Sequence, residues 1–228
     1  MALPQVEVCD IYSTLKGTGR NAGTPFVCVR LFGTNFQDRL DTHRYAWDTT
    51  ESKKRKKMLT ISEIVDRIAA LRSDKHRWLV TGGEPMLQQA YILDIADKFK
   101  EQFGYEPSIE IETNGLIMPL EQIYRRIANF NVELKLSNSI GSPTASMGTR
   151  ISESVLRFYV ASKKADFIFS ISSESDLKEV ISLQQVFKIP DENIWLKSVN
   201  PMIPLFIWET CLKRDFKLSS NLVEPTGL

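Results

Sequence analysis

The side chains best suited to chemistry begin in a loop at residues 33–48. This loop offers oxygen atoms and one imidazole over a short stretch of chain, from Thr34, Asp38, Asp41, Thr42 and His43. Carboxylate and hydroxyl oxygens are the ligands that Mg²⁺, Ca²⁺ and Mn²⁺ prefer. The spacing therefore indicates a metal site at Asp38, Asp41 and Thr42, with Mg²⁺ as a fitting ion. The alternative is a polar surface loop whose side chains bond nearby backbone groups.

Two glycine-containing turns follow predicted strands. Gly82, Gly83 and Glu84 come after one strand, and Glu112 and Asn114 lie at the end of the next. Ligands of parallel α/β sheets collect at the carboxyl ends of the strands. These turns therefore indicate a ligand site, for example for a nucleoside. The alternative is that the glycines serve tight strand-to-helix turns and that the Asn-Gly pair is an ordinary turn signal.

A run of five cations stands in an expected loop at residues 52–58: Lys53, Lys54, Arg55, Lys56 and Lys57. Successive like charges repel one another and are typical of a solvated segment. The same run could contact phosphate groups of nucleic acid, although no aromatic residue within it would stack on bases. We keep both interpretations.

The three cysteines, Cys9, Cys28 and Cys211, match no zinc, haem or redox spacing. Cys9 and Cys28 lie in apolar runs, where a cysteine usually behaves as a small hydrophobic residue. We expect all three to be structural thiols.

Composition indicates a single globular domain over residues 1–228. The chain is 43% hydrophobic and 25% charged, with a formal net charge of +1. Such a charge gives no general attraction to nucleic acid or to acidic partners. No apolar run approaches the roughly 18 residues that cross a bilayer, so we expect no membrane partner. The first residues lack a secretory signal pattern, and we expect a cytoplasmic protein.

Short β-rich runs alternate with amphipathic helical patterns. The predicted strands are 6–12, 26–32, 77–81, 108–113, 132–136, 166–171 and 194–198. The predicted helices are 61–71, 89–103, 120–130, 175–187 and 207–214, with Thr60, Ser62 and Ser173 as candidate N-caps. Repeated strand–helix units predict an α/β fold with a parallel sheet. The length favours an incomplete (β/α)6-type barrel, because a full eight-fold barrel usually needs about 250 residues.

Several of these segments, in this order, resemble the 7-carboxy-7-deazaguanine synthases, the radical S-adenosylmethionine (SAM) enzymes of the queuosine and 7-deazaguanine pathway. The resemblance is carried by residues 10–13, Gly17 and Gly19, and residues 45–48, 81–85, 112–115, 135–139 and 155–158. It implies a partial barrel of the radical SAM kind and a homodimer. It also implies that SAM, where it is retained, binds through Gly82, Gly83, Glu84, Glu112, Asn114 and Ser137.

The departures from the family fall on its chemistry. Family members carry C-x-x-x-C-x-x-C before an Asp-Thr pair, and Thr34, Asp38 and Asp41 stand at those positions here. A shift by one residue keeps the Asp41-Thr42 pair and recovers no cysteine. Because a [4Fe–4S] cluster is held by thiolates, we expect none. Three further family positions differ: Lys16-Gly17-Thr18-Gly19 replaces Gln-Gly-Glu-Gly, Glu133 replaces a serine, and Ile168 replaces a lysine.

These observations predict a homologue without the cluster, most consistent with an inactive catalyst kept for a purine-like ligand, a partner protein or a larger assembly. Two alternatives stay open. One is an active enzyme of 7-deazapurine metabolism that uses an oxygen-ligated metal in the loop 33–48. The other is a nucleic-acid-associated protein that uses the basic run at residues 53–57.

Overall fold

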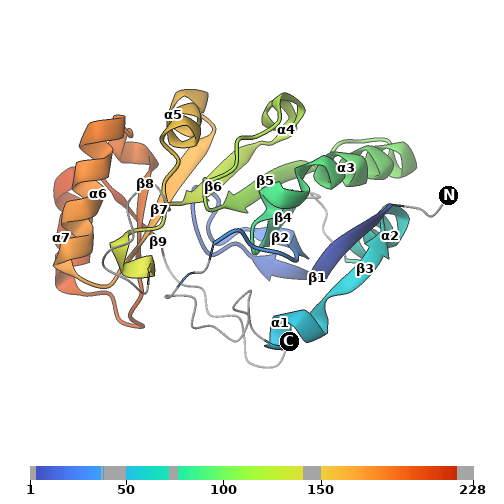
Figure 1. Cartoon of the computed structure of the whole chain (residues 1–228), viewed down its shortest axis with the longest axis horizontal. Coiled ribbons are helices and arrows are strands. Elements are labelled where there is room, and N and C mark those ends of the chain that lie inside the picture. The colour runs from blue at the N-terminus through green and yellow to red at the C-terminus, as the bar shows by residue number, and fades with distance from the viewer. Residues whose placement is uncertain (1–3, 37, 39–49, 72–76, 141–149, 220–228) are drawn as a thin grey trace.

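The sheet of this protein is an open, curved wall with helices along its outer face (Figure 1). A computed structural model describes residues 4–36, 38, 50–71, 77–140 and 150–219. Over these residues the nine strands follow the order β3-β1-β2-β4-β5-β6-β7-β8-β9. The strands β3 and β9 end this order, so the described barrel is incomplete. The expected α/β partial barrel is confirmed.

Two kinds of strand pairing build this sheet. The strands are β1 Gln5–Leu15, β2 Pro25–Leu31, β3 Lys57–Thr60, β4 Arg77–Gly82, β5 Ser108–Thr113, β6 Asn129–Glu133, β7 Ala165–Ile171, β8 Ile194–Ser198 and β9 Lys217–Ser219. From β2 to β9 every neighbouring pair is parallel. The strand β1 instead pairs antiparallel with both β2 and β3. The parallel sheet predicted from the sequence is thus a mixed sheet at its N-terminal end.

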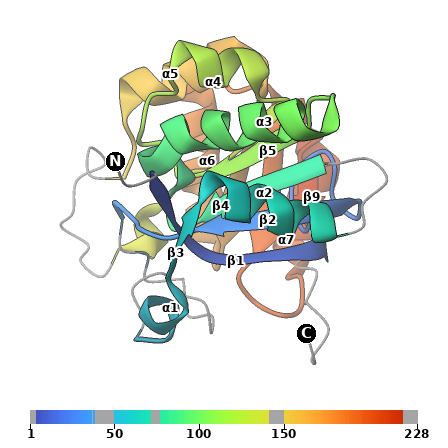
Figure 2. The ribbon, with the colours of Figure 1, turned by 90° about the vertical axis from the view of Figure 1, so that its right-hand side faces the viewer.

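The helices α2 to α7 lie along the convex side of this wall, whereas α1 stands apart from it beyond β3 (Figures 1 and 2). The helices are α1 Thr50–Arg55, α2 Ile61–Ala70, α3 Gln89–Phe103, α4 Glu121–Arg126, α5 Glu153–Ser162, α6 Glu174–Phe187 and α7 Leu205–Arg214. Of the three predicted N-caps, Thr60 and Ser173 are confirmed, whereas Ser62 lies inside α2, because the helix already begins at Ile61. Thr60 and Glu63 form a capping box on α2, and Ser173 and Asp176 form one on α6. Each box satisfies backbone N–H groups that a helix start leaves without partners.

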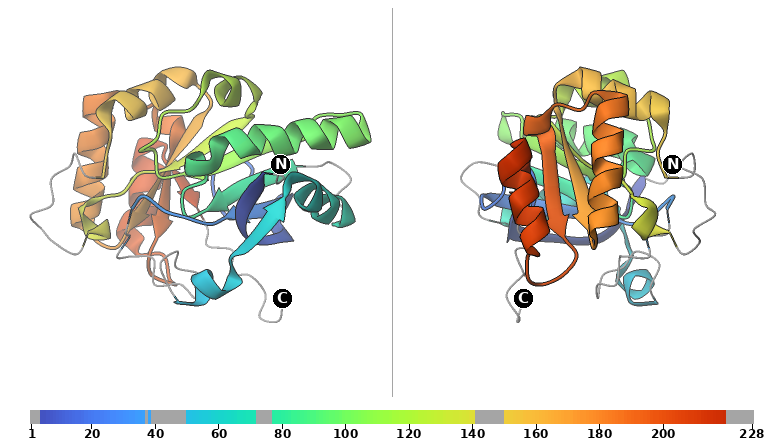
Figure 3. Two further views of the ribbon diagram at one scale, coloured as in Figure 1. Left: turned by 45° about the vertical axis from the view of Figure 1, so that its right-hand side comes forward. Right: turned by 90° about the vertical axis from the view of Figure 1, so that its left-hand side faces the viewer.

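The core lies between the strands and the outer helices. Alternate strand residues point outward and are buried there, for example Ile109 and Ile111 of β5 and Phe130 and Val132 of β6. Aromatic rings also pack in this layer: Trp78 lies edge-on against Phe99, with 4.9 Å between the ring centres. Figure 3 shows the outer helices around the strands from two further sides.

Several segments differ from the sequence prediction, among them α5 and β9, for which no element was expected. The helix expected at 120–130 ends at Arg126, and Asn129 already begins β6. The basic run expected in a loop instead occupies α1 and the start of β3. In the part of the chain that the structure describes, no helix is both long and apolar enough to cross a bilayer.

Candidate functional site

The inner face of the barrel is polar because the central strands alternate. In β5 the outward residues are isoleucines, whereas Glu110 and Glu112 occupy the inward positions. In β6 the inward positions hold Asn129, Asn131 and Glu133. Side chains of a strand point alternately to its two faces, so this period of two separates an apolar outer layer from a polar interior.

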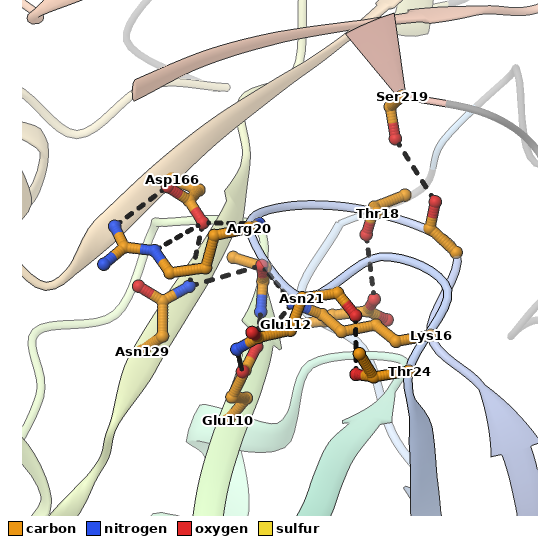
Figure 4. A network of polar contacts seen from close by, with 12 residues as sticks. Lys16, Thr18, Arg20, Asn21, Thr24, Glu110, Glu112, Asn129, Asp166 and Ser219 are labelled. Carbon is orange, nitrogen blue, oxygen red and sulfur yellow. Dashed lines mark hydrogen bonds and ion pairs between the residues drawn. The ribbon is translucent and has the colours of Figure 1, made fainter. Parts of the chain in front are cut away.

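The interior is closed at one end by the loop 16–24 between β1 and β2, which Figure 4 shows from close by. The ammonium of Lys16, fully buried, donates to the Glu110 carboxylate and, at 2.9 Å, to Oδ1 of Asn131. The amide of Asn21 also donates to Glu110. A buried ammonium is tolerated when it is paired and hydrogen-bonded in this way. We call this closed end the barrel floor.

Arg20 ties the same loop to β7. Its Nε and Nη2 donate to the two oxygens of Asp166 at 3.0 and 2.9 Å, and its backbone N–H donates at 3.0 Å. Asn129 adds a fourth bond to Asp166 at 3.1 Å. Burial alone would raise the pKa of Asp166, but these hydrogen bonds and the guanidinium charge outweigh it and lower the pKa. The buried charged groups of the barrel floor therefore each have an oppositely charged partner and further hydrogen bonds.

The loop passes so close to this network that Gly19 has no room for a side chain. A Cβ there would lie 2.2 Å from Oδ1 of Asn131, and φ is +72°. From the far end of the sheet, the hydroxyl of Ser219 donates to the carbonyl of Gly17 at 3.5 Å. Residues of β5, β6, β7 and β9 thus all form hydrogen bonds or ion pairs with this loop and fix its position.

The opposite end of the interior, at the carboxyl ends of the strands, reaches solvent. We call it the barrel mouth, formed by Thr81, Glu112, Glu133, Lys135, Ser170 and Lys197. These side chains are partly exposed, whereas the floor residues Lys16, Glu110, Asn131 and Asp166 are buried. A ligand of the interior would therefore approach from the mouth, as is usual for parallel sheets.

One part of the mouth centres on Glu112. Its two oxygens accept hydrogen bonds from Thr81 at 2.7 Å and from Thr18 at 3.2 Å. The threonines come from β4 and from the floor loop, so three elements meet at one half-buried carboxylate. Each carboxylate oxygen has a second lone pair that can accept from a ligand.

The other part of the mouth is a chain of charges. The ammonium of Lys135 lies 2.8 Å from Asp38 and 3.3 Å from Glu133, and Ser170 donates to Glu133 at 2.9 Å. Burial would raise the pKa of Glu133, but Lys135 and Lys197 lower it to about 2. The two carboxylates raise the pKa of Lys135 against the effect of its burial. Glu133 and Lys135 are therefore ionised near neutral pH.

The turn at Gly82 and Gly83 packs directly against the end of β2. A Cβ on Gly82 would lie 2.1 Å from the Leu31 carbonyl oxygen, and one on Gly83 would lie 2.1 Å from that of Gly33. The glycines thus permit a close approach of two backbones. This packing gives them a structural role, and SAM binding by them stays a prediction.

Glu84 lies behind this turn and is fully buried. Its carboxylate accepts from the backbone N–H groups of Met86 and Asn114 and from the hydroxyl of Thr113, at 2.8–3.0 Å. Burial raises the pKa of Glu84, and these hydrogen bonds oppose that rise. The side chain thus fastens the β4 turn to the β5 turn.

The remaining residues proposed for SAM also have partners. Asn114 donates from Nδ2 to Oδ1 of Asn35 at 2.7 Å, which links two loops at the mouth. Ser137 donates from its hydroxyl and its backbone N–H to Glu179 of α6, at 2.7 and 2.9 Å. Glu112 is thus the residue of this set that faces the interior beside the mouth.

Of the predicted metal ligands, the structure describes only Asp38. Its carboxylate forms an ion pair with the ammonium of Lys135 at 2.8 Å. Asp41, Thr42 and His43 lie outside the described residues, and the metal site stays a prediction. Among the residues that are described, no three His, Cys, Asp or Glu side chains gather as a metal-binding group.

The basic run lies on α1 and the edge strand β3. Lys53, Lys54, Lys56 and Lys57 extend from this margin, and Lys56 pairs with Glu7 at 2.7 Å and lies 5.0 Å from the centre of the Phe32 ring. Lysines on an edge strand also discourage pairing with another sheet. A nucleic-acid role for the run stays a prediction.

Curated proteins with similar sequences share one name. The chain is 32% identical over 228 residues to the 7-carboxy-7-deazaguanine synthase of Pyrobaculum aerophilum, covering 97% of this chain and 94% of the relative. It is 25% identical over 202 residues to the enzyme of the same name from Hyperthermus butylicus, covering 86% and 78%. No protein-family model matches the chain.

A solved structure has the same fold. The crystal structure of QueE from Escherichia coli superimposes with a TM-score of 0.68 over 94% of this chain and 93% of that chain. The sequence identity in this comparison is 18%, so it concerns the fold alone.

Proposed function

Because the chain belongs to the 7-carboxy-7-deazaguanine synthase family, we propose that it is a non-catalytic member which lacks the [4Fe–4S] cluster and binds a purine-like ligand at the barrel mouth. The sulfur atoms of the chain and the charges of the mouth support this proposal in turn.

The cysteines do not offer the donors that a cluster needs. A [4Fe–4S] cluster is held by converging thiolates. Cys9 is buried on β1, Cys28 is buried on β2, and Cys211 lies on α7, which packs against β8 and β9 at the other end of the sheet. Burial raises the pKa of Cys9 and raises that of Cys211 to about 11, which disfavours the thiolate form.

In the loop 33–48, the side chains of Thr34 and Asp38 instead form hydrogen bonds and an ion pair with other residues of the chain. The Thr34 hydroxyl donates to the Phe36 carbonyl at 2.8 Å and accepts from the Phe36 N–H at 3.1 Å. Asp38 pairs with Lys135. These oxygen atoms are hard ligands, which suit magnesium or calcium better than the iron of a sulfide cluster. The cluster therefore does not fit the residues present, and we derive no reaction step through it.

The mouth can recognise a polar heterocycle. Glu112 presents a carboxylate that would accept from N–H groups of a ligand, and Lys135 and Lys197 present ammonium groups that would donate to its carbonyl or carboxylate oxygens. A few placed polar groups on a concave face are typical of small-molecule sites. A purine-like ring carries both donors and acceptors on its edges, and this match is the observation that carries the proposal.

The loss of catalysis is tested by anaerobic reconstitution with iron and sulfide. We expect no thiolate-to-iron absorbance near about 400 nm and no 5′-deoxyadenosine when SAM and a strong reductant are added. Stoichiometric cluster and turnover of SAM would contradict the proposal.

Ligand binding is tested by calorimetric titration with guanine, 7-deazaguanine and SAM. We expect a purine to bind, and Glu112→Gln to weaken it about 10-fold or more, since a lost charge-assisted hydrogen bond costs about 1.5–3 kcal/mol. The control is Glu121→Gln, which removes an exposed carboxylate on α4. Equal affinity in the two variants, or no binding of either purine, would exclude the mouth as a purine site.

A further inference from the structure

The last two strands of the sheet carry cations on their inner face. The residues of β8 alternate, and Trp195 and Lys197 take the positions that do not face the outer core. On β9, Leu218 packs against that core, so Lys217 and Ser219 point inward as well. We call Trp195, Lys197, Lys217 and Ser219 the β8–β9 patch.

The strand register places these side chains next to one another. Lys197 and Ser219 are paired across β8 and β9, and Trp195 and Lys217 are paired one level further from the mouth. The ammonium of Lys217 lies 5.3 Å from the centre of the Trp195 ring. Two ammonium groups and a hydroxyl therefore meet on a surface that is two strands wide.

The protein around the patch does not neutralise these cations. In the described part of the chain, no carboxylate forms an ion pair with Lys197 or Lys217, whereas Lys135 has two such partners. The carboxylate of Glu133, on β6, is already bound by Lys135 and Ser170. Two ammonium groups on one concave face make the patch a place where the negative charge of a ligand is stabilised.

A donor of the patch also lacks an acceptor. The indole nitrogen of Trp195 is buried, and none of the described residues accepts a hydrogen bond from it. Buried polar groups of proteins usually have such a partner. The hydroxyl of Ser219 is buried as well, and its hydrogen bond to the carbonyl of Gly17 is long, at 3.5 Å. A ligand rich in oxygen atoms would supply acceptors for both donors.

The kind of donor on the patch favours a phosphate group. A planar carboxylate is matched best by the two-pronged guanidinium of an arginine, whereas lysine ammonium groups act as point charges and are common phosphate ligands. The donors of the patch come from two strands and from two levels of the sheet. This arrangement suits a tetrahedral group, whose oxygen atoms point in several directions.

The patch continues the site that is proposed above for a purine. Lys197 belongs to both, and β8 lies three strands from β5, which carries Glu112. At about 4.8 Å per strand this separation is about 14 Å along the curved sheet. A ribose phosphate attached to a purine at Glu112 would extend in this direction, toward the two lysines.

We propose that the ligand of the barrel mouth is a purine nucleotide whose phosphate group is bound by the β8–β9 patch. This assignment rests on the purine binding proposed above and adds the anionic half of the ligand. The residues that the family resemblance implies for SAM lie between Gly82 and Ser137, so they are separate from the patch.

The proposal is tested by calorimetric titration with guanosine and with guanosine 5′-monophosphate (GMP), which differ only in the phosphate. We expect GMP to bind about 10-fold or more tightly than guanosine, because its phosphate gains charge-assisted hydrogen bonds. The ratio of the two affinities should fall toward one in Lys197→Met and in Lys217→Met, and it should shrink as salt is added. Circular dichroism checks that each variant is folded.

The matched control is Lys213→Met. This substitution removes an exposed ammonium from α7, which packs on the outer side of β8 and β9. The ratio of GMP to guanosine affinity should therefore stay as it is in the wild type. A ratio that falls equally in all three variants would show a general effect of net charge and would overturn the patch as the phosphate site.

Titration with ribose 5-phosphate separates this assignment from the purine proposal. If guanosine and GMP bind equally, or if both lysine variants of the patch keep the wild-type ratio, the phosphate site is overturned and the purine site stands. If ribose 5-phosphate binds as tightly as GMP, loses that affinity in Lys197→Met, and guanosine does not bind, the phosphate site stands and purine recognition fails. If none of the three compounds binds, both proposals are overturned.

Discussion

The ammonium of Lys16 and the carboxylate of Glu110 form an ion pair inside the barrel, where their side chains are 0% and 3% exposed. The two residues come from the loop 16–24 and from β5, and Asn131 joins both of them. The pair therefore fixes the barrel floor to the central strands.

Removal of one partner should be costly. Lys16→Met leaves the Glu110 carboxylate buried without its cation, and breaking a buried pair in this way costs about 3–5 kcal/mol. Urea unfolding should show this loss. The control Lys98→Met, which removes an exposed pair with Glu101 on α3, should change the free energy of unfolding by less than about 1 kcal/mol.

A second substitution should rescue part of the loss. Glu110→Gln removes the buried charge and keeps one oxygen, which can accept from Asn21 or from Asn131 but not from both in their present positions. We expect Lys16→Met with Glu110→Gln to be more stable than Lys16→Met alone. If the double variant is less stable than the single one, the unpaired charge is not the cause.

The turn between β4 and η1 (Pro85–Gln88) offers a test of structure against ligand binding. Gly83→Ala should destabilise the protein without any ligand by about 1–3 kcal/mol, the usual cost of overpacking, because its Cβ would meet the Gly33 carbonyl. The comparison is Gly23→Ala, where φ is +82° but nothing lies within 4 Å, so only the backbone cost of about 1–2 kcal/mol applies. Unfolding of the ligand-free proteins in urea measures both.

One result for Gly83→Ala would contradict this structural role of the glycine. A Gly83→Ala protein as stable as the wild type, with ligand affinity lost, would mean that the glycine serves the ligand and not the packing of the two backbones.

Acid stability should depend on Glu133. Its folded-state pKa is about 2, below the ordinary value of 4.5. A depressed carboxyl pKa contributes stability that is present above the ordinary pKa and is lost as pH falls through the folded value. The free energy of unfolding should therefore fall between about pH 4.5 and 2, and Glu133→Gln should make that fall shallower.

The effect will be smaller than the pKa shift alone suggests, because the Glu133 side chain is 35% exposed and water screens it. The matched control is Glu121→Gln, at a side chain that is 74% exposed. If the free energy of unfolding falls equally steeply at low pH in Glu133→Gln and in the wild type, that result would contradict the chain of ion pairs at the mouth.

Much of the fold could be predicted because hydrophobic residues recur with the period of a helix in the amphipathic helices and form short apolar runs in the buried strands. The helix starts at Thr60 and Ser173 were found from local chemistry, since a capping residue acts within one turn. Strand direction has no such local signal. The antiparallel pairing of β1 with β2 arises from the long loop 16–24, whose path depends on Lys16 and Arg20 reaching residues of β5, β6 and β7.

The barrel floor was missed for a physical reason. Asn129 and Asn131 interrupt the apolar run, which favours a helix up to residue 130 and a strand only from residue 132, whereas β6 begins at Asn129. The missed signal was alternation: Asn-Phe-Asn-Val-Glu at 129–133 and Ile-Glu-Ile-Glu at 109–112 have the period of a strand with one polar face. Such a pattern indicates a polar interior, yet it cannot tell that Lys16, more than ninety residues away from Glu110, fills it.

Replacing all three cysteines tests whether they are structural residues or ligands of iron. A chain with Cys9→Ala, Cys28→Ala and Cys211→Ala loses every sulfur atom that could form a thiolate. If the thiols only pack, this variant should keep the purine affinity of the wild type and lose about 1–3 kcal/mol of stability to small cavities. Iron content after anaerobic reconstitution should be equally low in both proteins. Iron bound by the wild type and lost in the variant would show instead that these thiols converge on metal, and the non-catalytic role would have to be abandoned.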